Sequence, residues 1–200
     1  SIGLVGSEMC IRDRYRKGIR SFSVYEKTVV DFGCGALHPY NISALFYLNG
    51  AERCIAVDTD DIADVGSAAR SLYELLIDCV SMPSKWLLPG TELSKFMHRA
   101  ASFDFAALHD GDLAAGVKSV PITHVVGLIE DNITEAISVD LMVSCTVLEH
   151  VHNLPSLAKH FWRIMAIDGV SYHNVDYSDH GVHNDPSKNY WSFICLLYTS

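Results

Sequence analysis

The chain has 200 residues, 49% of them hydrophobic and 20% charged, which is enough for one domain with a buried core but short for two ordinary domains. Its formal net charge of -9 disfavours a surface that follows nucleic-acid phosphates. No apolar run reaches the roughly 18 residues of a membrane helix, and the start lacks the apolar centre of a secretion signal. We therefore expect a soluble cytoplasmic protein with a small-molecule substrate and without nucleic-acid or membrane partners. The sequence does not indicate its oligomeric state.

Both ends of the chain look foreign to the rest. "VGSEMCIRDR" (5–14) and "CLLYTS" (195–200) resemble translated sequencing adaptors, so we expect residues 1–14 and 195–200 to be non-native extensions. The domain itself then spans residues 15–194. Because the chain stops just after an apolar run without a turn, we also expect the last strands of the parent sheet to be missing.

Short apolar runs and helical patterns alternate from residue 28 onward. Two β-branched, apolar runs closed by Gly or Asp predict strands buried on both faces. A helical spacing of apolar residues lies between them, and a longer one follows the second run, with Asp60 or Asp61 placed to cap it. The elements expected in this half are strands at Thr28–Phe32 and Arg53–Asp58 and helices over 41–50 and 62–80.

The second half begins with a less regular stretch, 82–120, which we interpret as a helical insertion plus loops. Strand and helix patterns then alternate again, and this alternation predicts a parallel sheet with right-handed crossovers. The fold class expected is α/β, a Rossmann-like, mostly parallel sheet with helices on both faces. The elements expected here are strands at Ile122–Ile129, Val139–Cys145 and Val170–Asp176 and a helix at Leu154–Gly169.

The turn after the first strand reads "DFGCG". Ligands of such sheets bind at the carboxyl ends of the strands, and Gly33 and Gly35 can adopt positive φ and let the backbone approach a ligand. The third glycine of a dinucleotide fingerprint is replaced by His38, and the P-loop lysine is absent, so pyrophosphate binding is disfavoured. Asp31 precedes the turn, and Asp58 ends the second strand, where an acid can accept both ribose hydroxyls of a nucleoside.

Three segments, "VVDFGCG", "IAVD" and "VDLMVSCTVLEHV", together resemble the class I S-adenosylmethionine-dependent methyltransferases over about Thr28 to Asp176. The resemblance implies S-adenosyl-L-methionine as cofactor, with Asp58 on its ribose. The family often has an acid near the adenine after the third strand, where this chain has Leu128. The remaining cofactor residues that the resemblance implies are Asp31, Phe32, Gly33, Cys34, Gly35, Ser144 and Cys145 around the methionine end and Glu130 and Asp131 near the adenine.

Methyl transfer to a hydroxyl group needs a base to take the proton. His150 follows the fourth strand, and Asp179 and His180 follow the fifth, so these three side chains are the candidate catalytic residues. The histidines and acids of "HNVDYSDHGVHND" also invite a metal-binding interpretation, but strand alternation sends neighbouring side chains to opposite faces, so we expect no metal.

The function expected is methyl transfer to the oxygen or nitrogen of a small-molecule acceptor. The arrangement of "LHPYNISALFYLNGA", a long insertion and then "VDYSDH" resembles bacterial methyltransferases associated with surface-sugar biosynthesis, which implies a sugar-related acceptor. Two alternatives stay open: an NAD-dependent oxidoreductase, and a non-catalytic methyltransferase-like fragment that only binds the cofactor.

Overall fold

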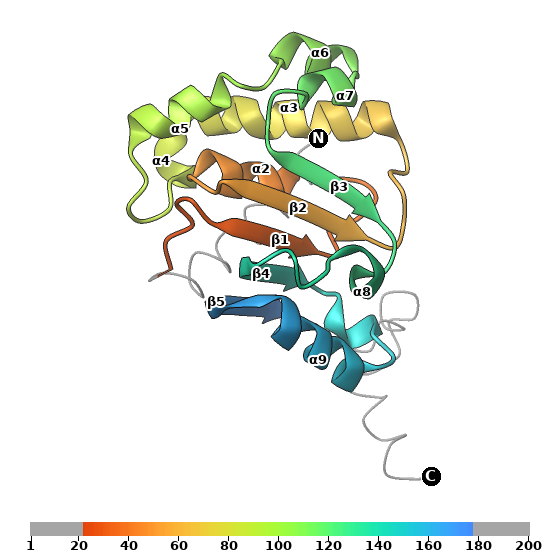
Figure 1. The fold of residues 1–200 in the computed structure, drawn as a ribbon. Helices are drawn as coiled ribbons and strands as arrows, with labels where there is room; N and C mark the ends of the chain where they lie inside the picture. Colours follow the sequence, from red (N-terminus) through yellow and green to blue (C-terminus); the bar gives the residue numbers. More distant parts are fainter. Residues whose placement is uncertain (1–21, 178–200) are drawn as a thin grey trace.

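The computed structural model describes residues 22–177, which form a five-stranded, all-parallel sheet with helices packed against it (Figure 1). The strand order is β3-β2-β1-β4-β5, so β1 lies at the centre, between β2 and β4. This is the Rossmann-like α/β fold expected from the sequence. The strands are β1 (Thr28–Phe32), β2 (Arg53–Asp58), β3 (Ile122–Val126), β4 (Val139–Cys145) and β5 (Met165–Asn174).

Helices make the crossovers between these strands. Within the described residues, no helix is long and apolar enough to cross a membrane. Four short helices follow one another between the long helix α3 and strand β3. The helices are α2 (Asn41–Leu48), α3 (Val65–Ser81), α4 (Pro83–Trp86), α5 (Leu93–Ala100), α6 (Phe105–Asp110), α7 (Leu113–Gly116), α8 (Ile129–Asn132), the 3-10 turn η1 (Leu148–His150) and α9 (Leu154–Ile164).

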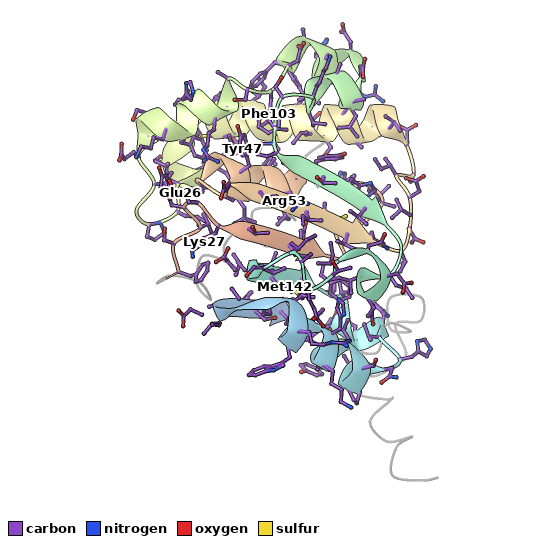
Figure 2. The ribbon with its side chains drawn as sticks, in the orientation of Figure 1. Glu26, Lys27, Tyr47, Arg53, Phe103 and Met142 are labelled. Atoms are coloured by element: carbon purple, nitrogen blue, oxygen red, sulfur yellow. The ribbon has the colours of Figure 1, made fainter. Side chains whose placement is uncertain are left out.

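The sheet divides the core into two layers, because successive side chains of a strand point to opposite faces. Val29 and Leu141 pack into the larger layer, with helices α2 to α7. Tyr47 of this layer meets Phe103 edge-on, with ring centroids 5.8 Å apart (Figure 2). Val30 and Met142 face the other way, into a smaller layer beneath α8 and α9 that also contains Leu157. The central strands are therefore buried on both sides, as their continuous apolar runs indicated.

Five expected elements have different bounds in the structure: α2, α3, β3, α9 and β5. The helix after β2 begins at Val65, capped by Asp64, whose carboxylate accepts the Ser67 N–H. Asp60 and Asp61 do not cap it: the Asp60 N–H donates to Asp58, and the Asp61 carboxylate accepts the N–H of the very next residue. The Asp60 backbone and the Asp61 carboxylate thus form hydrogen bonds within the loop before the helix.

Two further corrections concern the end of β3 and the junction of α9 with β5. Strand β3 ends at Val126 and not at Ile129, because Gly127 turns the chain with φ +129° and Ile129 starts α8. Helix α9 ends at Ile164, and β5 begins directly at Met165, so the strand expected at Val170–Asp176 starts earlier. Gly169, the expected last residue of the helix, lies inside β5, and β5 ends at Asn174.

Candidate functional site

The turn after β1 has the backbone conformation that its two glycines allow. Gly33 has φ +75° and Gly35 has φ +82°. A Cβ at Gly33 would lie 2.2 Å from Cγ2 of Val147, so the close approach at this position is to a side chain that follows β4. A Cβ at Gly35 would meet nothing within 4 Å. Gly35 is thus the glycine whose backbone is open to a ligand.

Asp58, at the end of β2, is held by the backbone on both of its carboxylate oxygens. The Gly35 N–H donates to Oδ2 at 2.7 Å, and the Asp60 N–H donates to Oδ1 at 3.0 Å. Each carboxylate oxygen can accept a second hydrogen bond, and the side chain is only half-buried. Asp58 can therefore receive two further donors from a ligand without giving up its contact with the glycine turn.

Asp31, near the end of β1, is a buried acid with only 4% of its surface exposed. Burial, and then the nearby charge of Asp58, raise the pKa of its carboxyl group from 3.8 to about 7, and no hydrogen bond from residues 22–177 to the carboxyl offsets this rise. Such a group gains free energy from any donor or positive charge placed beside it. The same burial raises the pKa of the Cys34 thiol, which is therefore a protonated, weakly reactive group.

A cleft of about 860 Å³ opens along the carboxyl ends of the central strands. One side of it contains Asp58, Asp60 and the segment 127–130, which follows β3. The other side is formed by the segment after β4, including Val147 and His150, and by Leu157 of α9. The cleft thus lies where parallel sheets bind their ligands, over the point at which the chain passes from β1 to either side.

Most of the site residues expected from the sequence line this one cleft. The exposed His150 of η1 is among them. Asp131 and Ser144 are not: Asp131 is an exposed residue of α8, and Ser144 is fully buried, with its hydroxyl against His173. Asp179 and His180 lie outside the described residues. The expected residues that line the cleft are Asp31, Phe32, Gly33, Cys34, Gly35, Asp58, Glu130, Cys145 and His150.

Several lining residues carry no distinguishing pattern in the sequence. Ile42 and Leu157 follow the same helical periodicity as core residues, so only the fold shows that they face the cleft. Thr146 also lines it, with φ +56°, which is rare for a β-branched residue. This conformation carries the chain from β4 toward Val147. His152 and Asn153 add polar groups at the same end. Among residues 22–177, no three His, Cys, Asp or Glu side chains are placed to hold a metal ion.

Comparisons with known proteins add little at the level of sequence. No protein-family model matches the chain, and no curated protein matches it. Among solved structures, the chain is similar to coclaurine N-methyltransferase bound to N-methylheliamine and SAH, with 14% identity and a TM-score of 0.46. That match covers 83% of this chain and 35% of the other, so the chain spans about a third of that protein's length.

Proposed function

We propose that this chain binds S-adenosylmethionine in the cleft and transfers its methyl group to a small-molecule acceptor. One observation carries the proposal: the Asp58 carboxylate is fixed on the Gly35 N–H while keeping acceptor capacity toward the cleft. A fixed carboxylate with two free acceptor positions suits the two hydroxyls of a ribose. The proposal assigns Asp58 to that sugar.

The other end of the cofactor carries positive charge, on its sulfonium and its amino group. Asp31 is buried beside the glycine turn, with no hydrogen bond to its carboxyl from the described residues. A positive group at this place favours the ionised form of the acid and relieves the cost of its burial. We therefore assign Asp31 to the methionine end, and we assign Glu130 and the apolar Leu128 and Ile129 to the adenine side.

His150 is the candidate base for an acceptor hydroxyl. It lies after β4, at the end of the cleft opposite Glu130, and its imidazole is exposed. An acceptor held between the methyl group and this imidazole can lose its proton to it during the displacement. The two alternatives make different predictions: an oxidoreductase binds NAD in this cleft, and a non-catalytic fragment binds the cofactor without turnover.

Isothermal titration calorimetry with S-adenosylmethionine and, separately, NAD tests the proposal. We expect S-adenosylmethionine to bind and Asp58→Asn to weaken its binding by about tenfold or more, because hydrogen bonds to a charged group contribute roughly 1.5–3 kcal/mol each. Asn keeps an oxygen for the Gly35 N–H, whereas its NH2 group cannot accept the Asp60 N–H, so circular dichroism checks that the variant stays folded. Asp61→Asn, at an exposed acid that does not line the cleft, is the matched control and should leave the affinity unchanged.

Turnover is followed separately, as release of S-adenosylhomocysteine with a panel of small hydroxyl and amine compounds. His150→Ala should lower the rate by about a hundredfold for a hydroxyl acceptor while the cofactor affinity stays the same. Binding of NAD but not of S-adenosylmethionine would overturn the assignment. Cofactor binding without turnover on any acceptor would favour the non-catalytic alternative.

A further inference from the structure

A second group of polar side chains lies outside the cleft, on β4 and β5. His173 Nδ1 is 2.7 Å from the hydroxyl oxygen of Ser144, and His173 Nε2 is hydrogen-bonded to the hydroxyl of Ser171. Ser144 and His173 are register partners on neighbouring strands, while Ser171 and His173 are two residues apart and therefore face the same side of β5. One imidazole thus joins a buried hydroxyl to an exposed one.

The imidazole of His173 is fixed in position by its neighbours. Its ring is stacked on the ring of Phe161 of α9, with centroids 5.6 Å apart and an interplanar angle of 13°. Burial lowers the pKa of His173 below 6.5, so the ring is neutral at pH 7 and can accept a proton. Ser144 is completely buried, which holds its hydroxyl at Nδ1. His173 is thus an oriented base, and the hydroxyl of Ser171 at its Nε2 is in the position of a nucleophile.

Ser171 opens onto an apolar groove of about 710 Å³ between α9 and β5. The groove is a separate space from the cofactor cleft, although Leu157 lines both. Its walls are hydrocarbon and aromatic, and Trp162 and Ile167 on its rim are strongly exposed, with relative exposures of 86% and 103%. Such a groove suits an acyl chain or an aromatic ring next to the Ser171 hydroxyl.

The edge of β5 also offers backbone donors. The Thr146 N–H donates to the carbonyl of Asn174, so Asn174 faces β4. Since N–H and C=O groups alternate in direction along a strand, the N–H groups of Ser171 and His173 point away from β4. Among the described residues, β5 pairs with β4 alone, so no described strand covers this edge. The Ser171 N–H takes no part in pairing with β4 and lies next to the Ser171 hydroxyl, where it would meet a negatively charged oxygen of a bound ester.

We propose that Ser171, His173 and Ser144 form a second active site that hydrolyses esters of apolar acyl groups. The Ser171 oxygen attacks the ester carbonyl carbon while its proton moves to His173 Nε2. The carbon–oxygen bond to the alcohol then breaks, and the alcohol leaves with that proton. A water molecule attacks the acyl-Ser171 ester in the same way, which releases the carboxylic acid and restores the hydroxyl. Ser144 acts as a positioning residue by accepting the Nδ1–H, which leaves Nε2 free to act as the base.

The experiment uses the full chain and two readouts, covalent labelling by a fluorophosphonate probe and hydrolysis of p-nitrophenyl butyrate. We expect peptide mapping by mass spectrometry to locate the label on Ser171. Ser171→Ala should abolish labelling and lower the hydrolysis rate by about a hundredfold. Ser138→Ala removes an exposed serine that lines neither space and should change neither readout.

The role of the other two residues needs variants that keep the fold. His173→Gln preserves a polar side chain, and its folding is checked by circular dichroism; it should lose labelling as Ser171→Ala does. Ser144→Ala should lower kcat without raising KM, and Ser144→Thr should restore part of the loss, which a purely structural role for Ser144 would not produce.

Three outcomes would overturn the proposal. These are no labelling of the folded chain, a label at a residue other than Ser171, and equal hydrolysis by the unchanged chain and by Ser171→Ala. None of these readouts depends on the methyltransferase assignment. Binding of S-adenosylmethionine to Ser171→Ala should match that of the unchanged chain, so failure of one proposal is distinguishable from failure of the other.

Discussion

Asp31 is a carboxyl group whose environment opposes its ionisation. Its pKa in the folded protein is about 7 and its ordinary value is 3.8, so between these two values the folded state holds a proton that the unfolded state has lost. This preference contributes stability that is complete below about pH 4 and is lost as the pH rises through 7. A difference of about three pH units corresponds to roughly 4 kcal/mol.

We therefore expect Asp31→Asn, without ligand, to be more stable than the unchanged protein at pH 8 and to show little advantage at pH 4. The gain should be of order 4 kcal/mol, because the neutral amide avoids the buried charge. Urea unfolding curves at both pH values measure it as the difference between the two proteins, which cancels the titration of other groups. A difference that is the same at both pH values would contradict the buried-charge explanation.

Gly33 and Gly35 share one backbone conformation but have different surroundings. Alanine at either position carries the strain of positive φ, about 1–2 kcal/mol, whereas only at Gly33 does the new methyl group collide with Val147. We expect Gly33→Ala to lower the free energy of unfolding by 1–3 kcal/mol more than Gly35→Ala, as overpacking generally does.

Adding Val147→Ala to Gly33→Ala should restore much of that difference, because the two methyl groups nearest the new Cβ are then gone. Chemical denaturation of the two single variants and the double variant measures this coupling. Gly35→Ala should instead reduce S-adenosylmethionine affinity, since its methyl group projects into open space in the cleft. An equal loss of stability at both glycines would show that the Val147 side chain moves away from the new methyl group without a cost in free energy.

Asn49 stabilises the joint between α2 and the segment around α4. Its buried amide donates to the carbonyls of Leu45 and Trp86, and its oxygen accepts the Leu88 N–H at 2.7 Å. We expect Asn49→Ala to cost about 3 kcal/mol in the free energy of unfolding, because three hydrogen bonds are lost and their backbone partners are buried or partly buried.

Thr91→Ala is the matched control, since it removes a single hydrogen bond of 3.3 Å to the Asn49 carbonyl and should cost less than about 1 kcal/mol. Thermal or urea unfolding compares the two variants. Similar losses would mean that the amide of Asn49 does not join these elements.

Three of the five strands were predicted with their correct bounds. The bounds of β1, β2 and β4 equal the predicted ones, because each is a continuous apolar run between chain-reversing or polar residues and is buried on both faces. The start of β5 was predicted too late, because the expected helix was continued to Gly169. In the structure Gly169 lies at the register shift of β5 against β4, where a Cβ would be 2.8 Å from the Val139 carbonyl oxygen. That contact involves residues 30 positions apart, which local patterns do not contain.

The candidate site divides in the same way. Gly35 and Asp58 belong to short motifs at strand ends, and their positions were predicted from the strands alone. Val147 belongs to the segment "VDLMVSCTVLEHV", but its contact with Gly33 depends on how the segment after β4 folds back over β1, and so does the place of Leu157 in the cleft. Local patterns do not show either of these placements. The resemblance implied that Ser144, near the carboxyl end of β4, lines the cofactor pocket, but alternation along the strand turns its side chain toward His173.

Across the whole molecule, the two faces of the sheet are unequally covered. The layer beneath α2 to α7 contains most of the buried hydrophobic residues, while the layer beneath α8 and α9 is small. Regions with few buried apolar contacts open at lower free energy than the rest of a protein. We expect amide hydrogens of α9 to exchange faster than those of β1 and α3 in hydrogen-exchange mass spectrometry.

S-adenosylmethionine should slow exchange in α9 more than in α3, because Leu157 of α9 lines the cleft and no residue of α3 does. NAD serves as the control and should have no effect. Equal slowing of both helices would indicate global stabilisation in place of a local effect.

The smaller layer, beneath α8 and α9, supports one wall of the cleft. The floor of the cleft is the centre of the sheet, and its far wall includes α9, which packs on the smaller layer. Movement of α9 can therefore widen the cleft while the larger layer stays in place. A ligand in contact with both sides would hold α9 against the rest of the cleft. The rates at which such a ligand binds and dissociates would then depend on how often α9 moves away from the sheet.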